Sequence, residues 1–228
     1  MAQNVNNTTF PNLLDLVAPY SCRGCHKPGK ILCERCKNNI IAQIQNLCPF
    51  CKEPTTKCTC QKHLSIPPTF IFSRRNSTIG TLIYDLKFHS ARSAAKPLAE
   101  ILSYVILPNY QNLIVVPLPT INHHIRKRGL DHTTIISNQF AKYYKQGAKV
   151  SHLLLRINKT TQVGSSRNQR LKQAQTAYIV NPKIRISPES TYLLLDDIWT
   201  TGASMLSATK ILQNSGAKNL ILTALALS

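Results

Sequence analysis

All eight cysteines of this 228-residue chain lie between Cys22 and Cys60. They form three CxxC pairs and one CxC pair, and mostly polar residues fill the gaps between them. A CxxC pair directs two thiolates at one ion, and two such pairs complete a tetrahedron around zinc. The sequence therefore predicts two structural zinc sites of four thiolates each, in a segment with so little apolar material that it should unfold without zinc.

Two pairings of these cysteines are open. The sequential pairing, which needs the shortest loops, gives one site of Cys22, Cys25, Cys33 and Cys36 and a second site of Cys48, Cys51, Cys58 and Cys60. An interleaved pairing is compatible with the same spacing. No cysteine is left over for an open coordination position, so catalysis by zinc is not expected. A redox role is disfavoured, because redox CxxC motifs come singly on a βαβ fold. His26 and His63 could replace a ligand, although a solvent-exposed loop histidine is the expected state of each.

The cysteine-rich segment ends where Pro67 and Pro68 interrupt the chain, and the composition changes there. At about 150 residues per domain, the length corresponds to roughly one and a half domains. We therefore expect a zinc-binding module at 1–64 and one α/β domain at 65–228.

The second part alternates apolar strands with amphipathic helices. Strands are expected at 69–72, 113–116, 153–155, 192–195 and 220–224, and helices at 77–88, 94–107, 132–144, 167–175 and 203–214. Gly216 follows the last helix at the position typical of a C-terminal cap. Strands that are apolar on both faces predict an α/β fold with a mostly parallel sheet covered by helices.

The charge is strongly positive, with 28 Lys and Arg against 9 Asp and Glu, a net +19. With 43% hydrophobic residues the chain is not a disordered basic tail, and the charge favours a polyanionic partner. The densest basic stretch, from 126 to 172, includes Arg126, Lys127, Arg128, Arg167, Arg170 and Lys172. Tyr143, Tyr144 and Tyr178 are candidates for stacking on bases of single-stranded DNA. A solvated basic face and tyrosines in the core are the simpler alternative.

Targeting signals do not stand out. The first 21 residues carry no Lys or Arg and no signal-peptide core, and no apolar run is long enough to span a membrane. We expect a cytoplasmic protein without membrane insertion. In that reducing compartment, cysteines bind metal more often than they form disulfides.

Two of the nine acids, Asp196 and Asp197, are adjacent at the end of the most apolar strand. The segment Thr200-Thr201-Gly202-Ala203-Ser204 follows and leads into a helix. Backbone N–H groups and hydroxyls at a helix N-terminus suit a phosphate, and the carboxylates can accept hydrogen bonds from sugar hydroxyls or hold a cation. In open α/β sheets ligands bind at the carboxyl ends of strands. The alternative, solvated acids before a capped helix, is weakened by the scarcity of acids in this chain.

The run LLLDDIWTTGAS resembles the phosphoribosyl-pyrophosphate (PRPP) motif of the type I phosphoribosyltransferases. Together with the upstream cysteines, the chain resembles the ComF competence-protein family, in which a zinc module precedes a phosphoribosyltransferase-like domain. The further matching pieces are LIYDLKFH with Lys87, VVPLP at 115–119, RKRGLDHT at 126–133, RINKTTQ at 156–162 and RNQRLKQAQTAY at 167–178. Leu130-Asp131-His132 stands where the family often has Phe-Asn-Gln.

The resemblance implies a role for each matched segment. Asp196 and Asp197 would bind the ribose hydroxyls, and Thr200, Thr201, Gly202, Ala203 and Ser204 would surround the 5′-phosphate. Pro117, Leu118, Pro119 and Thr120 would form the pyrophosphate loop, and Mg2+ would accompany PRPP. Residues 160–170 match the hood that covers the site, with Arg167 and Arg170 in it and Lys172 just beyond.

Three functions are compatible with these patterns. The first is a PRPP-binding factor for DNA uptake in natural transformation, which binds single-stranded DNA and works with other competence or DNA-processing proteins. The second is an active, Mg2+-dependent phosphoribosyltransferase, for which no residue stands out as a general base that would identify the acceptor. The third is a zinc-ribbon interaction protein with an idle site, which the intact Asp196-Asp197 and Thr-Thr-Gly argue against.

Overall fold

The fold is built on a five-stranded sheet in which all neighbouring strands are parallel. The computed structural model describes residues 20–106, 110–120, 131–157 and 177–228. In spatial order the strands are β3 (Thr69–Ile71), β9 (Asn219–Leu227), β8 (Thr191–Trp199), β4 (Leu113–Pro117) and β5 (Ala148–Val150). The prediction of an α/β fold with a mostly parallel sheet is confirmed.

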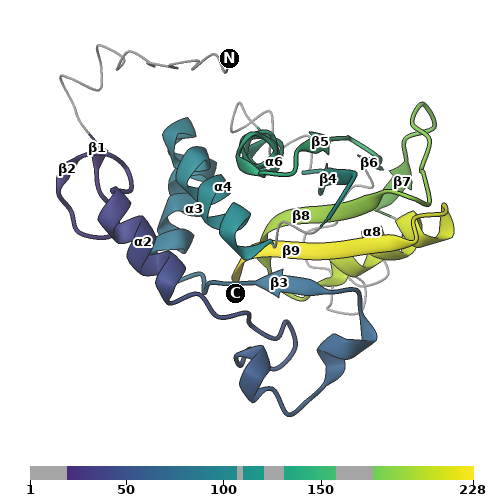
Figure 1. Ribbon diagram of the computed structural model, residues 1–228, viewed down its shortest axis with the longest axis horizontal. Coiled ribbons are helices and arrows are strands. Elements are labelled where there is room, and N and C mark those ends of the chain that lie inside the picture. The colour runs from purple at the N-terminus through teal and green to yellow at the C-terminus, as the bar shows by residue number, and fades with distance from the viewer. Residues whose placement is uncertain (1–19, 107–109, 121–130, 158–176) are drawn as a thin grey trace, which may run out of the picture.

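Helices cover both faces of this sheet (Figure 1). On one face lie α3 (Thr78–Phe88), α4 (Ala95–Val105) and α6 (His132–Tyr143), and on the other lies α8 (Ala203–Asn214). Because successive side chains of a strand point to opposite faces, β8 contributes to both layers. Leu193 and Leu195 lie in the cluster with α3, α4 and α6, whereas Tyr192 and Leu194 lie in the cluster with α8.

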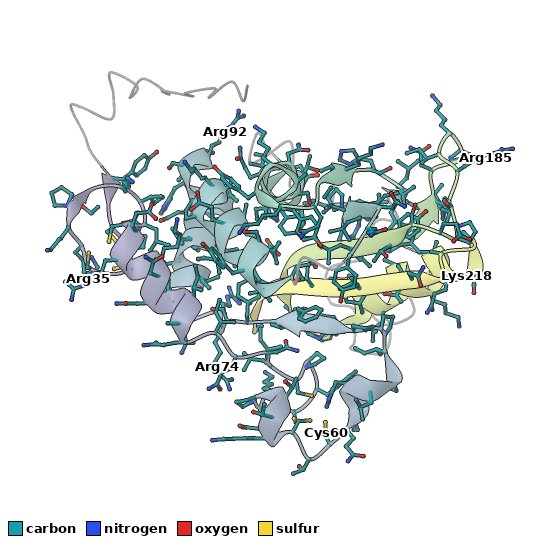
Figure 2. All side chains as sticks on the ribbon, viewed as in Figure 1. Arg35, Cys60, Arg74, Arg92, Arg185 and Lys218 are labelled. Carbon is teal, nitrogen blue, oxygen red and sulfur yellow. The ribbon has the colours of Figure 1, made fainter. Side chains whose placement is uncertain are left out.

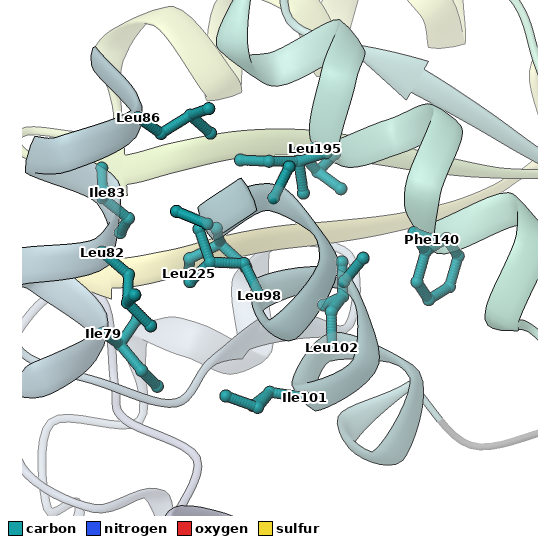
Figure 3. Close-up of a cluster of buried hydrophobic side chains, with 14 of the residues drawn as sticks. Ile79, Leu82, Ile83, Leu86, Leu98, Ile101, Leu102, Phe140, Leu195 and Leu225 are labelled. Carbon is teal, nitrogen blue, oxygen red and sulfur yellow. The ribbon is translucent and has the colours of Figure 1, made fainter. Parts of the chain in front are cut away.

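The larger of the two cores lies between the sheet and the layer of α3, α4 and α6 (Figure 3). Leu82 and Leu86 of α3 and Leu98 and Leu102 of α4 project into it at the i, i+4 spacing of a helix face. Ser77 fixes the start of α3, because its hydroxyl accepts a hydrogen bond from Gly80 N at 3.2 Å. The cap thereby satisfies one of the N–H groups that the first turn of a helix leaves without a partner.

Two strands are longer than their apolar runs predict. β8 continues from Thr191 to Trp199 and therefore contains Asp196 and Asp197, which the sequence places after the strand. The physical reason is the neighbour: β9 extends to Leu227, and Ile198 and Trp199 of β8 pair with residues of β9. A strand extends as far as its backbone pairs with a neighbouring strand, and polar side chains such as those of Asp196 and Asp197 do not end it.

A separate two-stranded antiparallel sheet consists of β6 (Leu154–Arg156) and β7 (Tyr178–Val180). The strand predicted at 153–155 is thus correct as a strand, but it lies outside the parallel sheet. The sequence missed β5, a three-residue edge strand, and also β7. The helix predicted at 167–175 lies outside the described residues, and the other predicted helices agree within about two residues at each end.

The first cysteine segment packs on α3 and α4 and includes β1 (Tyr20–Ser21), β2 (Pro28–Gly29) and α2 (Glu34–Ala42) (Figure 1). Cys22, Ile31 and Leu32 are buried in the same core as these helices. Arg23 Nε donates to Asp85 Oδ2 of α3 at 2.6 Å, and Lys37 of α2 pairs with Glu100 of α4. Apolar burial and two ion pairs therefore hold this segment on the helical layer.

The second cysteine segment covers the outer edge of β3. Leu47 N donates to Ile71 O at 2.7 Å, and the Asn46 side chain accepts from Ile71 N and donates to Thr69 O. These bonds satisfy backbone groups that an exposed edge strand would leave open to pairing with another chain. The short helices η1 (Thr55–Lys57) and η2 (Lys62–Ser65) follow and lead into β3. The domain division at residue 65 stays a prediction.

Among the described residues, none of the helices combines the length and the apolar character that crossing a bilayer requires.

We predict that Arg23→Ala destabilises the fold by about 2 kcal/mol, because it leaves the carboxylate of Asp85, which is 2% exposed, without its guanidinium partner. The value lies below that of a fully buried pair, since the Arg23 side chain is 34% exposed. Urea unfolding measures it. The matched control is Lys30→Ala, which breaks the exposed pair with Glu34 and should change stability by less than about 0.5 kcal/mol. Equal effects would contradict the assignment.

Candidate functional site

The candidate ligand site lies at the carboxyl ends of β4 and β8. From β4 the chain continues through α6 to β5 on one side of the sheet, and from β8 it continues through α8 to β9 on the other. The order of strands thus reverses between β4 and β8. In parallel α/β sheets such a switch point leaves a crevice in which ligands bind.

Asp197 is the buried anion of this site. Its Oδ2 lies 2.7 Å from His132 Nε2, at the start of α6, and pairs with Lys87 Nζ, near the end of α3. Burial raises the pKa of this carboxyl, but the hydrogen bond from His132 and the charge of Lys87 outweigh burial and hold the pKa below its ordinary value. Asp197 is therefore ionised and joins β8 to two helices.

Asp196 differs from its neighbour in charge and in exposure. It is only partly buried, and its Oδ1 accepts a hydrogen bond from Asp197 N at 2.8 Å. Burial and the negative charge of Asp197 raise the pKa of Asp196 to about 8. The structure thus separates the two acids, which the sequence treats as equivalent. Asp197 is already held by the ammonium group of Lys87 and the imidazole of His132, whereas Asp196 has no such partner among the described residues and is the acid available to a ligand.

The loop after β4 joins the site through backbone contacts. Pro117 is paired with Leu195 across the ladder, and Leu118 N donates to Leu195 O at 2.8 Å. Thr120 Oγ1 donates to Asp131 Oδ1 at 3.3 Å, and Asp131 also caps α6. The predicted pyrophosphate loop therefore lies beside the strand that carries the acid pair.

The loop after β8 requires its glycine. Gly202 has φ +75°, and a Cβ added there would lie 2.4 Å from Cζ2 of Trp199. Thr200 and Thr201 are exposed, and Thr201 Oγ1 accepts a hydrogen bond from Ala203 N at 3.4 Å. Gly202, the N-cap residue of α8, has no side chain to cap the helix. A helix N-terminus with flanking hydroxyls suits an anion.

Tyr178 and Arg156 connect the two loops. Arg156 Nη1 donates to Tyr178 Oη at 2.9 Å and approaches Pro119 O at 3.5 Å. Burial raises the pKa of Tyr178, although the charge of Arg156 and a hydrogen bond with Ser204 act in the opposite direction. The contacts thus run from Ser204 through Tyr178 and Arg156 to Pro119, and they link the loop after β8 to the loop after β4.

The sequence missed four residues of this site. In the sequence, Lys87 is notable only as part of the segment LIYDLKFH, and His132 only because it departs from the family pattern. In the structure both side chains contact the carboxylate of Asp197. Arg156 and Tyr178 lie at the ends of the matching pieces RINKTTQ and RNQRLKQAQTAY, but those pieces do not predict the hydrogen bond between them. Six predicted hood or nucleic-acid residues lie outside the described residues: Arg126, Lys127, Arg128, Arg167, Arg170 and Lys172.

The eight cysteines form two groups in chain order, the first from Cys22 to Cys36 and the second from Cys48 to Cys60. Within each group all sulfurs lie within 4.8 Å of one another. The separation is 3.8 Å between Cys25 and Cys33 and 3.6 Å between Cys48 and Cys60. Tetrahedral zinc with Zn–S bonds of about 2.3 Å places sulfurs about 3.8 Å apart. Both groups therefore fit zinc, and the grouping follows the sequential prediction.

Backbone N–H groups surround the sulfur of Cys22, in the first group. Gly24 N and Cys33 N each donate to Cys22 Sγ at 3.4 Å. Burial raises the pKa of Cys22, but backbone N–H groups outweigh burial and lower it to about 6, which favours the thiolate that binds metal. His63 Nδ1 lies 3.4 Å from Cys58 Sγ, so it contacts a ligand sulfur and does not replace one.

We predict about two zinc ions per chain, and about one in each of the variants Cys25→Ser and Cys51→Ser, because each removes a ligand from a different group. Mass spectrometry of the metal content measures this. If one substitution released both ions, the two sites would not be independent. Chelation of the zinc should lower the melting temperature.

We also predict that Asp196→Asn stabilises the protein at pH 8. In the native protein the folded-state pKa of Asp196 is about 8 against an ordinary 3.8. The unfolded chain therefore loses this proton first, and the unfolding free energy falls as the pH rises from about 4 to about 8. The variant should lack this fall, which thermal melts across that range measure. A variant less stable than the native protein at pH 8 would show that the Asp196 carboxylate is favoured in the fold.

Comparisons with known proteins give limited information. No protein-family model matches the chain, and no curated protein matches it. Among solved structures the chain is similar to a hypoxanthine phosphoribosyltransferase from Staphylococcus aureus, with 16% sequence identity and a TM-score of 0.39. The match covers 58% of this chain and 62% of that enzyme, which is less than two thirds of its length.

Proposed function

We propose that the crevice between β4 and β8 binds PRPP, and that the chain is a ComF-type protein with a phosphoribosyltransferase-like domain. One observation carries the proposal: the acid pair, the loop 117–120 and the loop 200–204 meet at the switch point of a parallel sheet. The sequence resemblance assigns these three segments to the ribose, the pyrophosphate and the 5′-phosphate. Their meeting in one crevice is what a single PRPP molecule requires.

Each part of the crevice has a separate task in this proposal. Asp196 accepts hydrogen bonds from the ribose hydroxyls, while Lys87 and His132 hold Asp197 in place. The N-terminus of α8 with Thr200 and Thr201 receives the 5′-phosphate. Mg2+, when bound, neutralises part of the pyrophosphate charge, and the carboxylate oxygens of Asp196 belong to the ligand class that Mg2+ prefers.

An active phosphoribosyltransferase is the second candidate, and one feature favours it. Asp196 has a pKa of about 8, so its carboxyl can lose or gain a proton near neutral pH. Groups with such shifted pKa values are concentrated at catalytic sites. Release of pyrophosphate in the presence of a panel of nucleobases distinguishes the enzyme from a binding factor.

Binding of single-stranded DNA during DNA uptake is the wider role that we propose, with the cytoplasm as the compartment and other DNA-processing proteins as partners. The net charge of +19 supports a polyanionic partner. In Figure 2, Arg35, Arg74, Arg92, Arg185 and Lys218 lie around the whole periphery. The positive charge is thus spread over the surface and is not confined to the crevice.

We predict that calorimetry detects binding of PRPP in the presence of Mg2+, and that Asp196→Ala with Asp197→Ala abolishes it. The double variant removes the ribose contacts and leaves Lys87 and His132 without their anion. The matched control is Glu189→Ala, which removes an exposed acid outside the crevice. If the native protein binds no PRPP, both site-based functions are wrong.

A further inference from the structure

A second hollow adjoins the crevice. It is a pocket of about 300 Å³ between α3 and the end of β8, lined by Arg75, Gly80, Thr81, Ile83, Tyr84, Lys87, Phe88 and Ile198. Arg75 N donates to Leu227 O at 2.8 Å, which places this side of the pocket at the end of β9. The pocket therefore lies at the same carboxyl edge of the sheet as the crevice. Its volume is at the lower end of the range for small-molecule sites.

Two aromatic side chains form one wall of the pocket. Tyr84 is 51% exposed and Phe88 is 54% exposed. They lie one helical turn apart on α3, and their ring centroids are 4.8 Å apart with an angle of 41° between the planes. Large rings that remain exposed beside a hollow indicate a binding surface, because a single-chain core would otherwise bury them.

Among the described residues that line the pocket, the charged ones are the cations Arg75 and Lys87. Arg75 contributes a guanidinium group that is exposed, and Lys87 contributes the ammonium group that also pairs with Asp197. Asp85, the nearest acid along α3, is buried and bound to Arg23 and His89. The pocket thus combines ring faces with positive charge, which suits a planar ring joined to a negative group.

The tyrosines that the sequence suggests for base stacking are elsewhere. Tyr144 is 4% exposed and Tyr178 is 3% exposed, so both belong to the cores, and the stacking role is wrong for them. Tyr143 is half-buried against the core of α3, α4 and α6, and its stacking role stays a prediction. The backbone at the positions of Tyr144 and Tyr178 directs the rings into the protein, and the residue type alone does not predict that direction. The rings of Tyr84 and Phe88 are exposed and line the pocket, so a base in the pocket can reach them.

We propose that this pocket binds an unpaired nucleobase, stacked on Tyr84 and Phe88, with its phosphate near Arg75. Every base has a π-face, so stacking on exposed rings accepts any base, and a guanidinium group matches a phosphate. The base can come from a free nucleotide or from single-stranded DNA. In the second case the inference deepens the DNA-binding part of the proposed function, and in both cases it is independent of PRPP.

The test measures the affinity of full-length protein for a fluorescent oligo-dT by anisotropy. Tyr84→Ala and Phe88→Ala should each weaken binding about tenfold, the loss typical of one stacked base. Tyr84→Phe keeps a ring and should retain most of the affinity. The matched control is Tyr104→Ala, which removes a 64% exposed ring on α4 outside the pocket and should leave the affinity unchanged. Thermal melts of all four variants establish that the fold is intact.

Two further measurements identify the source and the place of the base. If AMP displaces oligo-dT and Tyr84→Ala also weakens AMP, a free nucleotide uses the pocket, whereas displacement only by a second oligonucleotide assigns it to the strand. Ultraviolet crosslinking of bound oligo-dT should label Tyr84 or Phe88. If the native protein binds oligo-dT but Tyr84→Ala and Phe88→Ala bind equally well, the pocket is wrong and the DNA-binding function stands. If the native protein binds neither oligo-dT nor AMP, both are wrong.

Discussion

The arrangement of helices at the carboxyl ends of the parallel strands depends on the negative charge of Asp197. A buried carboxylate is costly unless it is paired, and here the ammonium group of Lys87 and the imidazole of His132 meet it from two different helices. The pair with Lys87 sets the end of α3 against β8, and the contact with His132 sets the start of α6 against the same strand. The crevice and the aromatic pocket both take their shape from helices that this one charge holds in position.

The neighbouring acid has the opposite character. Burial and the charge of the adjacent Asp197 carboxylate both oppose the ionisation of Asp196 and raise its pKa. Such local conflicts are typical of functional sites, where stability is given up for binding or catalysis. The two adjacent aspartates therefore differ in role: Asp197 stabilises the fold, and Asp196 is available to bind a ligand. Alternation along β8 makes this possible, because successive side chains of a strand point to opposite sides.

Much of the architecture is predictable from the sequence, because it depends on local patterns. The cysteine spacing predicts two four-sulfur groups, and the alternation of apolar strands and amphipathic helices predicts the parallel sheet. The site is predictable only in part. The acids and glycine-containing loop stand together in the chain, whereas Lys87 and His132 are far from Asp197 in sequence and meet it only through the packing of α3 and α6. The length of β8 likewise depends on its neighbour β9, and a strand's own residues do not reveal where its partner ends.

Trp199 offers a consequence of a different kind. It is the single tryptophan of the chain, and its ring lies against Gly202, at the turn from β8 into α8. The indole is 2% exposed, and it touches the loop that would surround a 5′-phosphate. Its emission spectrum therefore reports on one place in the molecule without any label. The fluorescence of Trp199 can thus report whether a ligand occupies the loop 200–204.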